Sequence, residues 1–543
     1  MRQKGFGPSR LSAAVVAVAF LVLLGPLLLS EIPPLTDYPN HLARYWLISG
    51  GSSDPLPSRF YRIDWSNAST NVALDWVAAL LAPWLPGMAI GRILLFVAAG
   101  LPPIGLVALN VGLFRRATPW QAIFPIAAWS ATFLMGFLSF QVGLGLALLF
   151  AAADPLVHPK LRRFAVVMRA PLGLVLIANH LFALVFYAVL LAGLAFGREP
   201  VSIGAWRERL WRAARAASWC LIPSLLYVAF AHALPVAATH GGLGEISFGN
   251  PAGKTVALFS PLVSYNVLVE LPLAVCVVAL IVWLARRGEL EMHAGLLVAA
   301  AGLMLLCIVS PHAGAGSSWI DDRFPIMAFL CVLAGSQLSV SVSPRRGLAI
   351  ALAAMSLVTV RTAWVGWNWR ETESNISAVR RALAQAPAGA RVLPLQHLQS
   401  LAARLSAPPG RYMFNLGDPT FRHYALLAIP LRQAFVPTLF ALHGKQPIQV
   451  RGAWDLLVDH SGGDLASVHS LDRPPGPADP SYLRSWRERF SYILVLNADM
   501  ADQDGPFRPP PGVEAVSDQG FAQLWRVAPR PGGGSAGFSR PYR

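Results

Sequence analysis

Long apolar runs alternate with short polar segments over the first two thirds of the chain. An apolar run of about 17 to 25 residues crosses a bilayer as an α-helix. Breaks at Gly136 and at Asn179-His180 are also compatible with re-entrant or kinked segments. The pattern predicts about 11 spans, at residues 11–30, 89–112, 119–134, 136–153, 163–178, 181–197, 215–235, 269–285, 293–310, 324–341 and 347–365.

The last third of the chain has a different pattern, with charge, proline and glycine and no spanning run. Its apolar and alternating segments predict one helix and three strands, at residues 371–384, 391–395, 491–496 and 521–527. We therefore expect a C-terminal α/β domain over 368–530, after a transmembrane domain over 1–367 whose loop at 31–88 carries interfacial helices. The glycine-rich end, 531–543, is predicted to be disordered.

Composition supports a membrane protein, because 55% of the 543 residues are hydrophobic and only 13% are charged. The net charge of +16, from 44 basic and 28 acidic residues, would indicate nucleic acid in a soluble chain. Here the basic residues gather in short loops after every second span, so they report topology and no nucleic-acid partner is expected. We expect an integral inner-membrane protein with a cytoplasmic N-terminus and an extracytoplasmic C-terminal domain.

The same topology places several polar loops on the external face. These are residues 31–88, 135–140, 179–180, 236–268 and 310–323, together with everything after about 366. Candidate chemistry therefore gathers on one side of the membrane. The four cysteines all fall in apolar runs without metal-ligand spacing, and nucleotide-binding and serine-hydrolase motifs are absent from the sequence.

The first candidate site follows the first span, in the segment Thr36-Asp37-Tyr38-Pro39-Asn40-His41. Asp37 and His41 are four residues apart, so a helix starting here would place both side chains on one face. Asp37 is a candidate general base or cation ligand, and His41 a candidate phosphate ligand or proton shuttle. The alternative is structural, with Asp37 as the N-cap of an ordinary interfacial helix.

A second candidate lies at the external mouth of the tenth predicted span, where Asp321, Asp322 and Arg323 are consecutive. Two carboxylates can bind a cation, and an arginine can clamp a phosphate with two hydrogen bonds. Charged groups also simply mark the membrane interface at such positions. We favour a functional site, because the topology places this loop on the same face as Asp37.

Weaker candidates lie in three other segments. Gln141 belongs to a glycine-rich stretch, 136–145, that close helix packing explains for the most part. Asn179 and His180 form a polar pair in an apolar run and need partners there, as substrate ligands or as packing residues. Lys254 is a candidate phosphate contact, although a lone loop lysine is more often simply solvated.

With these features the chain resembles the GT-C superfamily of polytopic membrane glycosyltransferases, and more closely uncharacterised bacterial membrane proteins of that architecture. The segments that carry the resemblance are the loop with Asp37, the stretch 136–145, Asn179-His180-Leu181-Phe182, Asp321-Asp322-Arg323 and the external tail. Many members have a second acidic residue near the loop carboxylate, whereas Tyr38 follows Asp37 here. We therefore expect Asp321 or Asp322 to complete the site from another loop.

The resemblance implies transfer of a sugar from a polyprenyl-phosphate-linked donor to an extracytoplasmic glycan, lipid or protein of the cell envelope. It implies Asp37 as base or metal ligand, a divalent cation such as Mg²⁺ or Mn²⁺ held with Asp321 and Asp322, and basic groups on the lipid phosphate. A lipid or glycan transporter is one alternative, but it predicts charges along several spans. A non-catalytic scaffold for envelope assembly is another. Donor, acceptor and oligomeric state are not set by the sequence.

Overall fold

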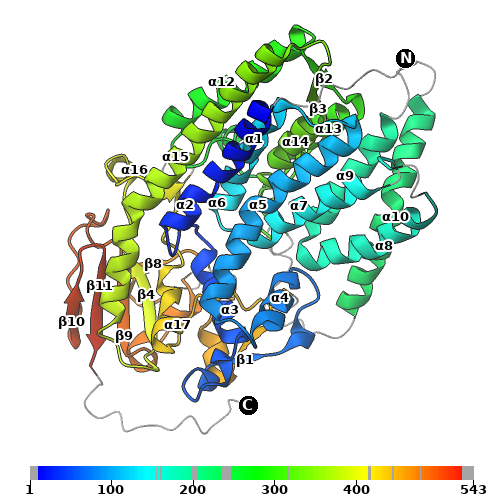
Figure 1. Cartoon of the computed structure of the whole chain (residues 1–543). Coiled ribbons are helices and arrows are strands. Elements are labelled where there is room, and N and C mark those ends of the chain that lie inside the picture. The colour runs from blue at the N-terminus through cyan, green and yellow to red at the C-terminus, as the bar shows by residue number, and fades with distance from the viewer. Residues whose placement is uncertain are drawn as a thin grey trace. The chain divides into compact units, whose positions relative to one another are not determined.

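The computed structural model describes residues 10–154, 156–158, 162–197, 206–233, 246–314, 317–413, 417–442, 445–460, 463–476 and 479–528 (Figure 1). The predicted disordered tail, 531–543, lies outside these ranges, and so do residues 236–245 of one predicted external loop. The chain divides into two compact units. Unit 1 comprises Met1–Glu31, Ser69–Leu74 and Ile93–Asn368, and unit 2 comprises Ile32–Ala68, Asp75–Arg92 and Trp369–Arg543.

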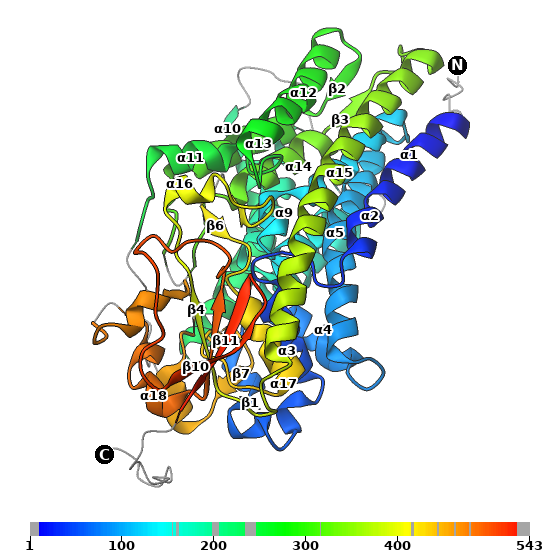
Figure 2. The ribbon, with the colours of Figure 1, turned by 90° about the vertical axis from the view of Figure 1, so that its left-hand side faces the viewer.

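Unit 1 is built of helices (Figure 2). The helices are α1 (Arg10–Val22), α2 (Leu24–Leu29), α5 (Gly87–Phe114), η4 (Pro119–Trp129), α6 (Ala131–Leu134), α7 (Leu138–Ala153), α8 (Arg162–Asn179), α9 (Leu181–Phe196), α10 (Trp206–Ala233), α11 (Pro251–Leu258), α12 (Val267–Arg286), α13 (Ala294–Val309), α14 (Arg323–Ala334) and α15 (Pro344–Leu383). Strands β2 (Leu290–Met292) and β3 (Ser336–Leu338) pair antiparallel. The division between the units falls inside α5 and α15.

Among the described residues, five helical segments are long and apolar enough to cross a membrane, by length and composition. They are Arg10–Leu29, Gly87–Phe114, Trp206–Phe230, Val267–Arg286 and Pro344–Leu383. Shorter apolar helices accompany them, at Leu138–Ala153, Val167–Asn179, Leu181–Phe196, Ala294–Val309 and Arg323–Ala334. The chain is therefore a polytopic α-helical membrane protein.

Two predicted elements form differently from the expectation. The segment 119–134 is a buried 3-10 helix, η4, followed by the short α6; Pro125, inside η4, cannot donate the backbone hydrogen bond of an α-helix. The helix predicted at 371–384 continues the last span without a break. No proline interrupts α15 after Pro344, so a single helix extends to Leu383.

Glycine determines the close approach of α9 to its neighbours, as predicted for the 136–145 stretch. A Cβ atom on Gly143 of α7 would collide with the Cβ of Ala183 on α9. On the other side of α9, a Cβ on Gly295 of α13 would collide with the backbone oxygen of Gly193. Small residues permit such backbone contacts in membrane helices.

A buried ion pair joins α12 to α15. Glu270, in the first turn of α12, binds the guanidinium of Arg361, and neither side chain is more than 1% exposed. The carboxylate also accepts hydrogen bonds from Ser264 N and Oγ (2.6 and 2.9 Å), Tyr265 N (2.8 Å), Asn266 N (3.0 Å) and Trp364 Nε1 (3.1 Å). Arg361 in α15 and Arg169 in α8, which pairs with Asp154, are thus charged residues within the helices of unit 1.

Unit 2 contains a mixed sheet. In its described part the strand order is β10-β11-β9-β4-β8 (Figure 1). The central strands are parallel and the β9-β11-β10 side is antiparallel. The strands are β4 (Val392–Gln396), β8 (Ala466–Ser467), β9 (Tyr492–Leu496), β10 (Val513–Asp518) and β11 (Ala522–Val527). Strands form at all three predicted positions, and β4 and β9 are buried along almost their whole length.

Unit 2 also joins the segment after α2 to the C-terminal third of the chain. Strand β1 (Tyr61–Ile63) pairs antiparallel with β7 (Ile448–Val450), and α3 (Tyr38–Ile48) packs on η7 (Tyr424–Leu427). The remaining elements are short: η1 (Gly51–Ser53), η2 (Pro57–Arg59), η3 (Trp65–Asn67), α4 (Ala73–Leu81), β5 (Tyr412–Met413), β6 (Asp418–Pro419), α16 (Leu401–Arg404), α17 (Ala428–Arg432), η8 (Gly452–Leu457), η9 (Val468–Leu471), η10 (Ser481–Leu483) and α18 (Trp486–Arg489).

We expect Glu270→Gln to lower the free energy of unfolding by about 3–5 kcal/mol, because it leaves the buried Arg361 charge uncompensated. Thermal unfolding of the purified protein in detergent measures the loss. Glu289→Gln is the matched control, since Glu289 pairs with the more exposed Arg346 and its change should cost about 1 kcal/mol or less. Equal losses in both variants would contradict a special role for the Glu270 pair.

Candidate functional site

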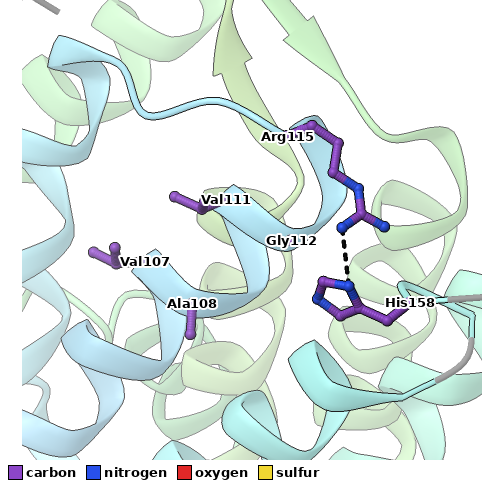
Figure 3. A pocket seen from close by; sticks show the side chains of 6 residues that line it. All are labelled: Val107, Ala108, Val111, Gly112, Arg115 and His158. Carbon is purple, nitrogen blue, oxygen red and sulfur yellow. Dashed lines mark hydrogen bonds between the residues drawn. The ribbon is translucent and has the colours of Figure 1, made fainter. Parts of the chain in front are cut away.

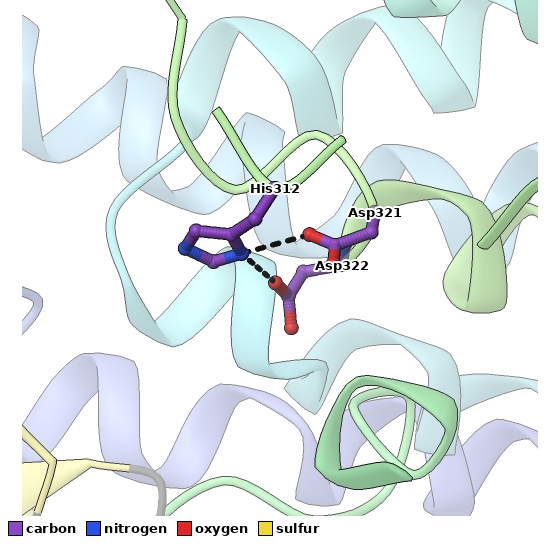
Figure 4. Close-up of side chains that lie close together, drawn as sticks. All are labelled: His312, Asp321 and Asp322. Carbon is purple, nitrogen blue, oxygen red and sulfur yellow. Dashed lines mark hydrogen bonds and ion pairs between the residues drawn. The ribbon is translucent and has the colours of Figure 1, made fainter. Parts of the chain in front are cut away.

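A histidine and two carboxylates meet in unit 1, in the loop between α13 and α14 (Figure 4). The His312 Nδ1 atom lies 2.9 Å from Asp321 Oδ1 and 3.7 Å from Asp322 Oδ2. The potential ligand atoms of the three residues all lie within 4.8 Å of one another. Both carboxylates are almost fully buried, whereas the histidine is about a third exposed.

Lys254, from α11, supplies a positively charged side chain to this cluster. Its Nζ lies 2.8 Å from Asp321 Oδ2, and it donates hydrogen bonds to the backbone oxygens of Cys307 and Ser310. Each oxygen of Asp321 thus faces a nitrogen, with His312 on one and Lys254 on the other. The arrangement neutralises Asp321 and fixes the loop to α11.

The two adjacent carboxylates have opposite pKa shifts. Burial opposes the charge of Asp321, but the hydrogen bonds from His312 and Lys254 outweigh it and hold the pKa below its usual range. Burial, together with the charge of Asp321, raises the pKa of Asp322 to about 7. The hydrogen bond to Asp321 raises the pKa of His312 despite partial burial. Near neutral pH one carboxylate is charged and its neighbour is close to its titration midpoint.

Two of the predicted polar segments come together around Phe182. The guanidinium carbon of Arg323 lies 4.9 Å from the centre of the Phe182 ring, and 5.0 Å from that of Phe137. The ring of His180 lies 5.7 Å from that of Phe182. Arg323 also donates to Ser317 Oγ at 3.3 Å. His180 and Arg323, the first residue of α14, thus both lie against the Phe182 ring.

Asn179, His180 and Gln141 all have local structural roles. His180 Nδ1 accepts a hydrogen bond from Phe182 N at 3.2 Å and so caps α9. Asn179 donates to Val175 O within its own helix, and its side-chain oxygen is buried without a partner among the described residues. Gln141 donates to Ser130 Oγ and Thr132 Oγ1 at 2.9 and 2.8 Å. The buried Gln141 amide thus braces the turn at the start of α6.

Asp37 and His41 belong to unit 2. Asp37 occupies the N-cap position of α3, but in the described structure its side chain makes no capping hydrogen bond. Its Oδ1 instead lies 3.4 Å from His423 Nε2. Asp37 therefore lies at the predicted N-cap position, but its side chain does not supply the capping hydrogen bond. His423 is a group that the sequence analysis did not single out.

His41 is buried and faces a different partner from Asp37. Its Nδ1 lies 3.1 Å from Arg44 Nη2, and Arg44 Nε lies 2.7 Å from Asp75 Oδ1. Arg44 and Asp75 have no more than 1% of their side chains exposed. His41 is thus part of a buried network that links α3 to α4.

A pocket at the end of α5 is lined by six residues, Val107, Ala108, Val111, Gly112, Arg115 and His158 (Figure 3). Arg115 Nη1 and His158 Nδ1 lie 2.9 Å apart at its polar side. The lining contains no carboxylate, and it includes none of the site residues expected from the sequence.

Comparisons with known proteins give a limited result. No family model and no curated protein sequence matches the chain. Among solved structures, ArnT from Cupriavidus metallidurans in the apo state is similar, with a TM-score of 0.49 and 13% identity. The match covers 95% of this chain and 97% of that chain. A match at this score and identity assigns neither activity nor substrate to this protein.

Sequence reasoning missed two histidines of these clusters. His312 lies in the same polar loop as Asp321 and Asp322, between two apolar runs, and this proximity was a usable signal. His423 carries no comparable signal, because its neighbour Asp37 lies almost 400 residues earlier in the chain.

We expect Lys254→Met to reduce the free energy of unfolding by about 2 kcal/mol, because Asp321 loses a charged hydrogen-bond donor. Thermal unfolding in detergent of this variant, of Asp321→Asn and of the double variant tests the coupling. The double variant should lose less than the sum of the single changes. Additive losses would show that the two side chains do not interact.

Proposed function

We propose that the protein is a GT-C-type glycosyltransferase of the inner membrane. It transfers a sugar from a polyprenyl-phosphate-linked donor to an extracytoplasmic glycan, lipid or protein, and its C-terminal domain lies on that side of the membrane. The observation that carries the proposal is the environment of the Asp37 carboxylate. Its carboxylate stands at a helix start without capping it, and 18% of the side chain is exposed. Such a carboxylate retains an oxygen that can accept a proton.

In this reaction Asp37 is the base. The acceptor hydroxyl gives its proton to Asp37 while its oxygen bonds to the anomeric carbon of the sugar. The bond between that carbon and the phosphate oxygen breaks, and its electron pair leaves with the lipid phosphate. Arg323, Lys254 and His180, all in unit 1, are assigned to the donor phosphate, since cationic donors stabilise the charge that develops there.

A divalent cation is the proposed cofactor, held by His312, Asp321 and Asp322. Two carboxylates and an imidazole suit Mn²⁺ in particular. The donor atoms fit such an ion, but Lys254 already faces one oxygen of Asp321 and must share it. The ion would supply positive charge to a leaving phosphate.

A transporter of lipids or glycans is the second candidate, because charged residues do occur within helices of unit 1. In both pairs, Glu270 with Arg361 and Asp154 with Arg169, the two charged side chains bind each other directly. A transport path requires groups that exchange partners with a substrate. Because these charged side chains already bind each other, we favour the enzyme over the transporter.

We expect Asp37→Asn to reduce sugar transfer by about 100-fold or more, because the amide cannot take the hydroxyl proton. The assay follows radiolabelled sugar from a panel of undecaprenyl-phosphate-linked hexoses and pentoses into bacterial membrane lipid and glycan extracts. Asp64→Asn is the control, since Asp64 lies in the same segment and only caps η3. Full transfer by a correctly inserted Asp37→Asn protein would contradict the base role.

We expect Mn²⁺ added after chelation to raise the melting temperature of the wild-type protein. Asp322→Asn should weaken this binding by about tenfold or more, whereas Lys254→Met should strengthen it by removing a competing charge. Glu291→Gln is the control, because Glu291 pairs with Arg116 away from the cluster. A Mn²⁺ response that is unchanged in Asp322→Asn would place the ion elsewhere.

A further inference from the structure

The partner of Asp37 within unit 2 is the imidazole of His423, which has no role in the proposed reaction described above. His423 is 1% exposed and directly precedes η7, where its side chain caps no helix. Its Nε2 faces Asp37 Oδ1 at 3.4 Å. Its Nδ1 is buried and has no hydrogen-bond partner in the part of the chain that the structure describes. A buried ring nitrogen without a partner is costly, so the position requires an explanation.

The backbone explains why Asp37 turns to His423. An N-cap residue that binds the first free N–H groups of a helix normally has extended backbone angles. Asp37 has φ −88° and ψ −9°, which are helical values. Its backbone oxygen accepts hydrogen bonds from Asn40 N and His41 N, both at 3.1 Å, while its side chain does not cap. The carboxylate is thus available to His423.

The ring of His423 is held by packing. It meets the ring of Phe440 edge to face, with centres 5.1 Å apart. Phe440 is fixed in turn by its backbone N–H, which donates to Asn40 Oδ1 at 3.0 Å, while Asn40 Nδ2 donates to Thr438 O at 3.2 Å. Asn40 and Asp37 both belong to the start of α3, so one segment positions both members of the pair.

The nitrogen environments assign the tautomer. A neutral imidazole carries one N–H, and the nitrogen that faces a carboxylate is the one that keeps it. Nε2 of His423, 3.4 Å from Asp37 Oδ1, is therefore the nitrogen that carries the N–H in the neutral ring. Other charges nearby are engaged: Arg422 binds Asp418 and Asp464, both at 2.8 Å.

Across Phe440, the ring of His41 lies 6.5 Å from the Phe440 ring, and its Nδ1 faces Arg44. The two histidines therefore serve different partners. His41 belongs to the network of Arg44, and His423 belongs to Asp37.

We propose that His423 is a positioning residue for Asp37. The contact of Nε2 with Oδ1, at 3.4 Å, holds the carboxylate in one orientation, so that Oδ2 is directed to the acceptor hydroxyl and takes its proton. His423 itself gains and loses no proton in this step. The inference rests on the proposed base role of Asp37. It adds His423, which is distant from Asp37 along the chain, to the same site.

Two substitutions of His423 separate positioning from packing. His423→Phe keeps an aromatic ring against Phe440 and removes the donor, whereas His423→Gln places an amide N–H near the former Nε2. We expect His423→Phe to lower kcat for sugar transfer by about 10- to 100-fold with little change in KM, because the base loses its orientation. His423→Gln should retain most of the wild-type rate.

The comparison of kcat with KM supplies a readout that distinguishes positioning from a general loss of structure. A general loss of structure would reduce the rate in both variants. An equal loss in both variants, or a loss that appears in KM instead of kcat, would overturn the proposal.

His460 provides the matched control. Its Nε2 lies 3.4 Å from Asp455 Oδ1, the same separation as in the proposed pair, and it belongs to the same unit. His460→Phe should leave kcat and KM unchanged. A loss of kcat in this variant as large as in His423→Phe would show that the effect is not specific to Asp37.

A stability cycle tests the pair without any activity. The melting temperatures of Asp37→Asn, His423→Phe and the double variant should be non-additive, with the double variant losing less than the sum. Additive losses would overturn the contact itself. The losses can be non-additive while the wild-type protein transfers no sugar from any donor of the panel. That result would retain the contact between the two side chains, but it would overturn the glycosyltransferase assignment and with it the positioning role.

Discussion

The constraint on which unit 1 depends is that polar groups buried among apolar helices must find partners inside the protein. Glu270 shows how it is met, because a single carboxylate collects N–H and O–H groups from the turn before α12 and from α15, including the guanidinium of Arg361. Without such pairing a buried charge would be strongly destabilising. The interaction also fixes the η4 region, since Arg361 binds the backbone oxygen of Trp129.

The same constraint makes the remaining polar clusters informative. Asp321 is neutralised by Lys254 and His312, and the second carboxylate, Asp322, is left with a raised pKa. In unit 2, Asp37 has His423 as its polar partner while part of its side chain is exposed. In the cluster of unit 1, the two neighbouring carboxylates have opposite pKa shifts, which is a common property of groups used in acid and base chemistry. Each cluster contains an acidic residue from a polar segment beside an apolar run and a histidine whose ring nitrogen lies 2.9 Å (His312) or 3.4 Å (His423) from it.

Much of the helical framework was predictable because apolar runs and helix length are local properties of the chain. Predictions from the same periodicities also found β4, β9 and β11. The exception at 119–134 has a local cause that hydropathy does not measure, namely Pro125 inside η4. The continuous α15 shows the opposite error, in which a change of composition near residue 368 was interpreted as an end of the helix.

The sequence by itself determined the membrane class, most of the helices and the acidic residues that are candidates for a functional site. Each of these follows from residue type and spacing over a few turns. Only the tertiary structure decided which partner each acid has. His423 reaches Asp37, and Lys254 reaches Asp321, through contacts between segments that are distant along the chain. Whether the Asp37 side chain caps α3 was also decided by the fold. A helical φ and ψ at that residue turn its carboxylate away from the helix N–H groups, and residue identity alone does not specify these angles.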